Sequence, residues 1–296
     1  MKKTLSFVLL SLFIFATQVS ARDYLFNLTA FDFSVKHIAE SDFEDSDVGI
    51  KQTEFELQFI MPMKVSSKDF VTVSPQIRAN KIEFTGTQGT GIDDDDFPEV
   101  LFSGELNMAY VHKFEKEWSS IVKVSPGIKS DLEDIDEKDF SFSATVMGQK
   151  NFAKGSAGLG LAYSDNFGSP EFFPVLGFLW NFNDSWKLYG TLPVNIYLEK
   201  KFSESFNAGL SGEITGGQYR LSEDSPWNEA VLNHTKVLIG PYADFKAGQK
   251  SRIKIAAGIV TAQEMEFRDK DDTDKILSEA DIEDSVYINL NIYYPF

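Results

Sequence analysis

The three histidines, His37, His112 and His234, are the side chains in this sequence best suited to proton transfer, so their neighbours decide whether a hydrolase site is present. A nucleophilic hydrolase needs a serine, threonine or cysteine within hydrogen-bonding reach of such a base. None of the three has a serine two residues further on, where one face of a strand would carry both groups, and the chain has no cysteine. We therefore predict no catalytic residues, no cofactor and no enzymatic activity.

Runs of acidic residues are the second feature that could do chemistry, because Ca²⁺ takes about six to eight oxygen ligands in flexible arrangements. The runs cover Asp42 to Asp47, Asp93 to Asp96, Asp131 to Asp139 and Asp269 to Asp274. The last run is not an EF-hand loop, because its sixth place holds an aspartate where that loop needs glycine. Solvated loop tips explain these runs as well as metal sites do, so the sequence leaves metal binding unknown, with weak divalent bridging to lipopolysaccharide phosphates as one role.

The overall composition excludes several classes of partner and site. The chain has 28 basic and 45 acidic side chains, a formal charge of −17. Nucleic acid is a poor partner for such a surface, since phosphate binding needs clustered lysine and arginine. The absence of cysteine excludes disulfides and thiolate metal sites.

The first 21 residues have the three parts of a secretory signal peptide. Lys2 and Lys3 precede an apolar run from Leu5 to Ala16, and small residues follow at Val19 to Ala21. A spanning helix needs roughly 20 apolar residues, so this run is too short for a membrane anchor, which is the alternative interpretation. We predict a signal peptide over residues 1–21 and one domain over residues 22–296.

Apolar and polar residues alternate through most of the remaining chain, which is the period of a β-strand with one apolar face. Phe55, Leu57 and Phe59, for example, alternate with Glu54 and Glu56. A soluble sandwich and a membrane barrel both use such strands, but most runs here cover about 12 to 16 residues, against about 5 to 6 in globular proteins. The sequence therefore predicts an all-β fold, a transmembrane antiparallel up-and-down β-barrel.

Short connections alternate with long acidic or glycine-rich ones, as periplasmic turns alternate with external loops in such barrels. With both chain ends on the periplasmic side, this alternation predicts about twelve strands. Residues 186–202 do not fit the count, and fourteen strands would result if they form a hairpin near Leu192 and Pro193. The twelve expected ranges are 24–37, 50–63, 70–84, 99–114, 118–129, 140–152, 156–164, 172–182, 206–220, 231–245, 251–267 and 282–296.

The same alternation assigns each side chain to the lipid or to the lumen. Charged residues on the polar face should face inward, where they could line a wet pore or pair across it. These lumen-facing candidates are Glu54, Glu56, Arg78, Glu105, Lys123, Lys129, Glu213, Lys236 and Lys254.

The end of the chain carries the most specific local pattern. Ile288, Leu290, Ile292, Tyr294 and Phe296 place an apolar residue at every second position back from the last one. This pattern resembles the C-terminal signal, ending in phenylalanine, by which Gram-negative outer-membrane barrels are handed to the barrel-assembly machinery.

Two internal stretches resemble a known family. They are the run from Asn183 to Pro193, NDSWKLYGTLP, and the run from Gly209 to Arg220, GLSGEITGGQYR. Both look like a family of outer-membrane β-barrel domains whose function is unknown. The resemblance implies the fold and a place in the outer membrane of a Gram-negative bacterium, and it carries no active site.

Two functions follow from these observations. The first is a passive channel or narrow transporter for small solutes, and the alternative is a structural or interaction barrel with a plugged lumen and functional external loops. Twelve strands would enclose a small lumen, between barrels of about eight strands that side chains fill and porins of about sixteen. Expected partners are outer-membrane lipids, lipopolysaccharide, the assembly machinery and small solutes, and no nucleic acid.

Overall fold

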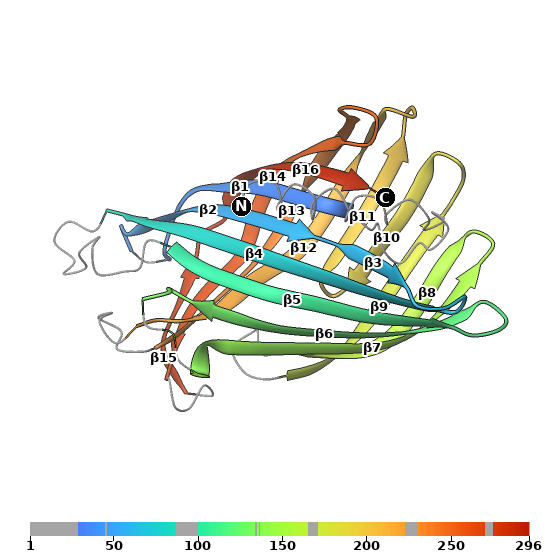
Figure 1. Cartoon of the computed structure of the whole chain (residues 1–296). Helices are drawn as coiled ribbons and strands as arrows, with labels where there is room; N and C mark the ends of the chain where they lie inside the picture. The colour runs from blue at the N-terminus through green and yellow to red at the C-terminus, as the bar shows by residue number, and fades with distance from the viewer. Residues whose placement is uncertain are drawn as a thin grey trace, which may run out of the picture.

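Antiparallel pairing between consecutive strands builds the whole structure, which is a computed structural model (Figure 1). The structure describes residues 29–44, 46–86, 100–133, 135, 137–164, 171–222, 230–269 and 275–295. The predicted signal peptide and Phe296 lie outside these residues. Within them, no helix is long and apolar enough to cross a membrane.

Short and long connections alternate between the strands, and one 3₁₀ turn, η3 (Glu137–Asp139), precedes β7. In chain order they are β1 (Thr29–Asp42), β2 (Gly49–Phe59), β3 (Met61–Lys64), β4 (Asp69–Thr85), β5 (Val100–Lys113), β6 (Trp118–Ser130), β7 (Phe140–Phe152), β8 (Gly155–Ser164), β9 (Glu171–Asn181), β10 (Trp186–Leu192), β11 (Asn195–Lys201), β12 (Phe206–Arg220), β13 (Val231–Lys246), β14 (Arg252–Arg268), β15 (Ile276–Ile282) and β16 (Ser285–Pro295).

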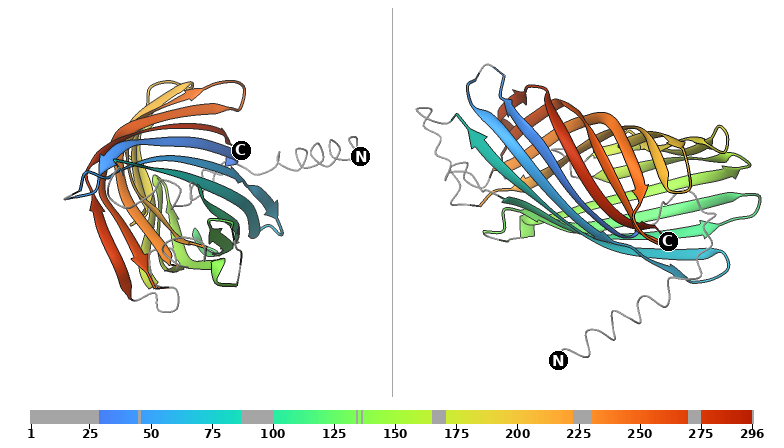
Figure 2. Two further views of the ribbon diagram at one scale, coloured as in Figure 1. Left: turned by 90° about the vertical axis from the view of Figure 1, so that its left-hand side faces the viewer. Right: turned by 90° about the horizontal axis from the view of Figure 1, so that it is seen from above.

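These segments make a ring of fourteen strands, because two of the strands are each interrupted once. β2 and β3 both pair with β4, and β15 and β16 both pair with β14. β1 pairs with β16 from Thr29 opposite Pro295 to Ile38 opposite Tyr287, which closes the ring. Figure 2 shows the sheet curving round until the blue β1 lies beside the red β16.

The predicted up-and-down barrel is confirmed, whereas the favoured count of twelve strands was wrong and the alternative of fourteen is correct. Residues 186–202 form the hairpin β10–β11, in which Trp186 lies opposite Lys200 and Thr191 opposite Asn195. The predicted strand count did not include this hairpin, because its turn consists only of Pro193 and Val194. This turn is far shorter than the other outer connections. Part of the expected outer loop 268–281 is also strand, since β15 extends the ladder of β14.

The outer face of the ring is apolar, which is what lipid requires of a membrane barrel. Phe55, Leu106, Ile255 and Leu290 are each at least 40% exposed, although they are large and apolar. At the end with the short turns, the outward residues are aromatic and lie close to lysines, as with Lys150 Nζ 5.6 Å from the Trp118 ring centroid. The exposed aromatic residues at this end include Phe114, Trp118, Phe152, Trp180, Phe182, Trp186, Phe202 and Phe245.

The short turns mark one end of the barrel, and the turns after β3 and after β5 lie at its right-hand end in Figure 1. We call this the periplasmic end, because short turns face the periplasm in single-chain membrane barrels. The opposite, outer end is where β15 lies. The charged lumen candidates alternate with the exposed apolar residues along their strands, and all but Lys123 are buried or half-buried.

Candidate functional site

The inner face carries a buried network of charges between β2, β1 and β13. Lys236 is 1% exposed, and its ammonium lies 2.5 Å from Glu54 Oε1 and donates to Gln52 Oε1 at 2.6 Å. Lys36 donates to Glu54 Oε2 at 3.0 Å from the neighbouring strand. One carboxylate therefore holds two lysines, and Gln52 also lies 3.4 Å from Nε2 of His234.

Two further ion pairs run along the inner wall of β2, β4, β5 and β6. Arg78 lies 3.1 Å from Glu56, and Lys129 lies 3.4 Å from Glu105. Lys123, on the same wall, is exposed to the lumen. Among these residues, three carboxylates lie beside five cationic side chains, and all of them except Lys123 are paired.

Tyrosines form the inner wall nearer the periplasmic end. Lys254 lies 5.2 to 5.7 Å from the ring centroids of Tyr197, Tyr242 and Tyr293, within the range of a cation–π contact. The Tyr197 hydroxyl donates to Glu213. These residues place both charge and aromatic surface along the inner wall.

A polar cavity of about 260 Å³ opens below the tyrosines at the periplasmic end. Most of its charged groups are paired, since Lys187 lies 2.9 Å from Glu199, and Arg252 donates to Asp244 at 2.9 Å. In the turn after β11, the hydrogen bond from Lys201 lowers the pKa of Glu204 below its ordinary range. The residues lining the cavity are Asn181, Asn183, Asp184, Ser185, Trp186, Lys187, Glu199, Lys201, Ser203, Glu204, Asn207 and Arg252.

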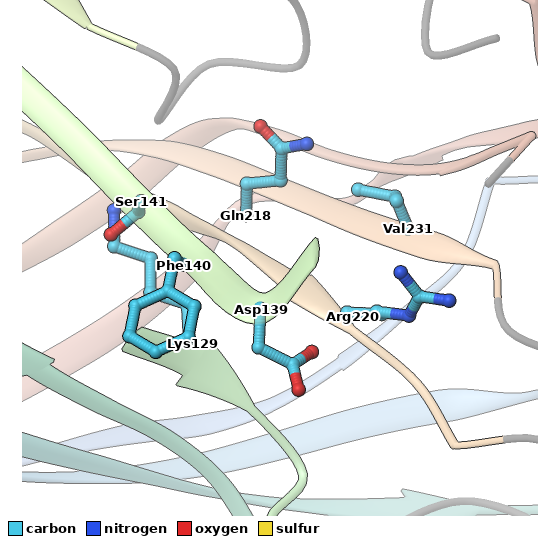
Figure 3. Close-up of a pocket in the computed structure, with 7 residues that line it drawn as sticks. All are labelled: Lys129, Asp139, Phe140, Ser141, Gln218, Arg220 and Val231. Carbon is cyan, nitrogen blue, oxygen red and sulfur yellow. The ribbon is translucent and has the colours of Figure 1, made fainter. Parts of the chain in front are cut away.

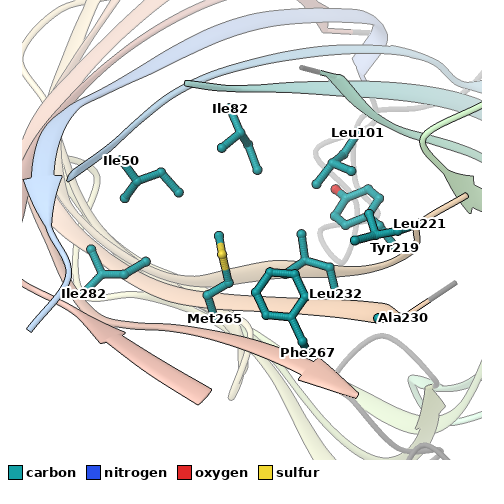
Figure 4. Packing of buried hydrophobic residues seen from close by; sticks show 10 residues of the cluster. All are labelled: Ile50, Ile82, Leu101, Tyr219, Leu221, Ala230, Leu232, Met265, Phe267 and Ile282. Carbon is teal, nitrogen blue, oxygen red and sulfur yellow. The ribbon is translucent and has the colours of Figure 1, made fainter. Parts of the chain in front are cut away.

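An apolar cluster fills the barrel near the outer end, and its side chains point toward one another in Figure 4. Leu101, Leu221 and Leu232 are completely buried in it. We call this cluster the outer plug, and it comprises Ile50, Ile82, Leu101, Tyr219, Leu221, Ala230, Leu232, Met265, Phe267 and Ile282. Its members come from strands around the barrel, so apolar side chains occupy the interior at this height.

The sequence analysis missed the outer plug, although the sequence holds a signal for it. Leu232 has the same parity as His234 and Lys236, and Ile50 has that of Gln52. Apolar residues at inward-facing positions near an outer loop therefore indicate that the interior of the barrel excludes water at that height. No residue of the plug was predicted, because only charged positions were considered on the inward face.

A second, smaller cavity of about 70 Å³ lies where β12 approaches β6 and β7 (Figure 3). Arg220 is paired in parallel with Ser130, a residue of a strand that is far from β12 in the ring order. The lining residues, drawn in Figure 3, are Lys129, Asp139, Phe140, Ser141, Gln218, Arg220 and Val231.

The histidines are held by partners other than serine. Nδ1 of His112 lies 2.7 Å from Asp69 Oδ1, at the periplasmic aromatic belt, and Nδ1 of His37 lies 3.1 Å from Thr53 Oγ1. Asp69 also accepts from Ser66, so in this group the carboxylate lies between serine and histidine. A serine-based hydrolase needs the histidine in that middle place, and the arrangement does not support one.

Three carboxylates gather on β14 and β15, from Glu264, Glu266 and Glu279, with one oxygen of each within 4.8 Å of the others. Glu266 already accepts hydrogen bonds at 2.8 Å from both Asn233 and Arg268, which occupy much of its capacity. All four acidic runs singled out in the sequence lie partly or wholly outside the described residues, Asp93 to Asp96 wholly.

Four of the five predicted assembly residues lie on the outward row of β16, and the fifth, Phe296, lies outside the described residues. Ile288, Leu290 and Tyr294 are 54%, 43% and 42% exposed, and Ile292 is half-buried on the same row. The row therefore faces lipid in the folded barrel. Recognition of this row by the assembly machinery stays a prediction.

Comparison with known proteins gives a family and several distant barrels. Residues 17–295 match the family described as "Domain of unknown function (DUF6268)". Among solved structures, the chain is similar to a KdgM porin (10% identity, TM-score 0.37, 90% of this chain and 99% of that one). It is also similar to the COG4313 outer membrane channel from Pseudomonas putida F1 (8% identity, TM-score 0.45, 94% and 100% of the chains). No curated protein matches the chain.

Proposed function

We propose that this chain, which belongs to the DUF6268 family, is a channel for small solutes in the outer membrane of a Gram-negative bacterium. The ring of fourteen strands is wider than barrels of about eight strands, which side chains fill, and narrower than porins of about sixteen. The apolar outer face, the periplasmic aromatic belt and the short turns at one end are features of outer-membrane barrels.

The observation that carries this proposal is the cavity of about 260 Å³ inside the periplasmic mouth. It is lined by amides, hydroxyls and paired charges, and above it Lys123 is exposed to the lumen. A wall that was only a scaffold would gain stability by filling such a space, since protein interiors are normally close-packed. A polar space at the mouth instead supports the entry of a hydrated solute of small size.

Single-channel recording of the refolded protein in planar bilayers tests the proposal. We expect a small conductance in the parent protein and a shift of ion preference toward anions in Glu105→Gln, because charge in a narrow polar lumen sets selectivity. Glu115→Gln is the matched control, since Glu115 is exposed in the turn between β5 and β6, outside the lumen. A parent without conductance in any recording would contradict the proposal.

A plugged structural barrel is the second candidate, and the outer plug is the observation that favours it. In that case the external loops would carry the function and the lumen would pass nothing. Leu232→Ser, within the plug, separates the two candidates. A channel should conduct more after this change, and a barrel sealed along its whole length should stay silent.

The proposed partners of the barrel follow from its outer face and its outer rim. Outer-membrane lipids would cover the apolar face, and lipopolysaccharide would meet the outer rim, where acidic residues such as Asp42 and Glu44 lie. The assembly machinery would act on the outward row of β16 that ends near Tyr294. Loss of the folded protein from the outer-membrane fraction after deletion of the last strand would support this placement.

A further inference from the structure

The ring has different numbers of strands at its two ends. At the periplasmic end, β11 pairs with β12 from Lys201 opposite Asn207 to Asn195 opposite Glu213, so all fourteen strands close the ring. The last hydrogen bond between these strands runs from the Ile214 N–H to the Val194 carbonyl at 2.9 Å. Beyond it, the hairpin β10–β11 has ended.

The hairpin is too short to reach the outer end. Its strands have 7 residues each. At about 3.3 Å per residue and a tilt of about 40°, they rise only about 18 Å, against an apolar band about 25 Å tall. The turn at Leu192 to Val194 is apolar and partly exposed, as expected of a tip that stays within this band. The neighbouring strand β12 continues to Arg220 without its former partner.

At the outer end, β12 pairs with β6 instead. Arg220 lies opposite Ser130 in a parallel bridge, and the Asp131 N–H donates to the Arg220 carbonyl at 3.3 Å. The Ser222 N–H donates to Asp131 Oδ2 at 2.7 Å, and the Ser222 hydroxyl donates to Glu133 at 3.0 Å. We call this group of contacts the latch.

The latch divides the ring. It closes a smaller ring of nine strands, made by β12, β13, β14, β15, β1, β2, β4, β5 and β6, and leaves β7 to β11 outside it. A ring of about eight strands is just wide enough for side chains to fill. The outer plug is that filling, since its members come from β2, β4, β5, β12, β13, β14 and β15 or lie directly beside them.

The contacts of the latch are few compared with those that hold β12 on its other side. β12 pairs with β13 along its whole length, from Phe206 opposite Phe245 to Arg220 opposite Val231. Its outer third can therefore leave β6 and remain in the sheet. The cavity at Gln218 and Ser141 lies along this seam, where the two walls are already not close-packed.

We propose that the latch is a gate. Its release lets the outer end widen from nine strands toward the twelve that reach this end, and opens the lumen past the outer plug. This inference rests on the proposed channel function. The closed state is the one described here, with Tyr219 of β12 and Leu221, the residue that follows this strand, packed into the plug. When β12 leaves β6, these two side chains leave the opposite wall at Leu101 with it.

A disulfide across the latch tests the gate, and the absence of native cysteine makes the experiment specific. Paired strands lie about 4.8 Å apart, within the roughly 4.4–6.8 Å between Cα atoms that a disulfide allows. We expect Ser130→Cys/Arg220→Cys to show at least a tenfold loss of open time when oxidised and recovery after reduction. Ser143→Cys/Ser164→Cys, across the permanent pair β7–β8, should conduct equally in both redox states.

Asp131→Ala provides the opposite change, because it removes the acceptor of the Ser222 N–H and should lengthen the open time. If the oxidised latch variant conducts as well as the reduced one, the gate is refuted while the channel stands. If neither the parent, the reduced variant nor Asp131→Ala conducts, the channel and the gate are both refuted. Circular dichroism of each refolded variant confirms that the barrel has formed.

Discussion

Replacing Lys236 by methionine tests whether the buried network on the inner face holds the barrel together. The ammonium of Lys236 is 2.5 Å from Glu54 and 2.6 Å from the Gln52 carbonyl oxygen, and its side chain is almost fully buried. Methionine has a similar length and no charge, so the substitution removes both contacts without leaving a large void.

The magnitude follows from what the substitution leaves behind. Breaking a buried ion pair costs about 3–5 kcal/mol when it strands a charge. Here Lys36 still holds Glu54 at 3.0 Å, so the carboxylate keeps one partner. Gln52 loses its donor, at a cost of about 1–3 kcal/mol, and removal of a buried ammonium offsets part of the loss. We therefore expect Lys236→Met to lower the free energy of unfolding by about 3 kcal/mol.

Urea unfolding of the protein in lipid vesicles, followed by tryptophan fluorescence, measures this free energy. Lys123→Met is the matched control, because Lys123 lies on the same inner face but is exposed, and it should cost less than about 1 kcal/mol. In a double-mutant cycle with Glu54→Gln, the two changes should couple by about 1 kcal/mol or more. The reasoning is refuted if Lys236→Met is as stable as the parent, since desolvation of the lysine would then outweigh both contacts.

Three further predictions concern the membrane face and export. Leu290→Arg should block folding, since arginine on the lipid face costs about 2–4 kcal/mol at mid-bilayer, whereas Asn289→Arg on the inner face should be tolerated, as refolding yields will show. Intact mass of protein taken from membranes should correspond to cleavage after Ala21, with Arg22 first; a retained N-terminus would contradict export by a cleaved signal. Deleting Phe296 should lower the folded fraction in cells while refolding in detergent stays near normal, and equal loss in both settings would count against an assembly signal.

The alternation of residues was enough to predict the fold class. Leu106 and Leu290 are exposed on the outer face, whereas Glu105 contacts Lys129 across the inner one. Successive side chains of a strand point to opposite faces, so the alternation can be recognised within one strand without knowing its partner strand. The strand count is not local in this sense, and a turn of two residues at Pro193 was enough to hide a hairpin.

The latch could not be predicted by the same reasoning, because it depends on contacts between distant parts of the chain. Ser130 and Arg220 are 90 residues apart in the sequence, and no local pattern around either residue indicates that the two pair. Their contact depends on two facts that only the ring supplies: the hairpin β10–β11 ends early, and the freed edge of β12 carries backbone groups that need partners. The nearest strand that can supply them across the lumen is β6.

The same argument explains why the inner face changes character along the barrel. Where fourteen strands enclose the lumen, the inward residues are polar and charged, and a cavity of about 260 Å³ remains. Where nine strands enclose it, the inward positions are Leu101, Tyr219, Leu232 and Met265, which exclude water. A narrow ring cannot hydrate inward polar groups, and burying them without partners would cost free energy. Apolar residues therefore occupy the inward-facing positions where the ring narrows. Any opening of this barrel has to widen the ring at that height.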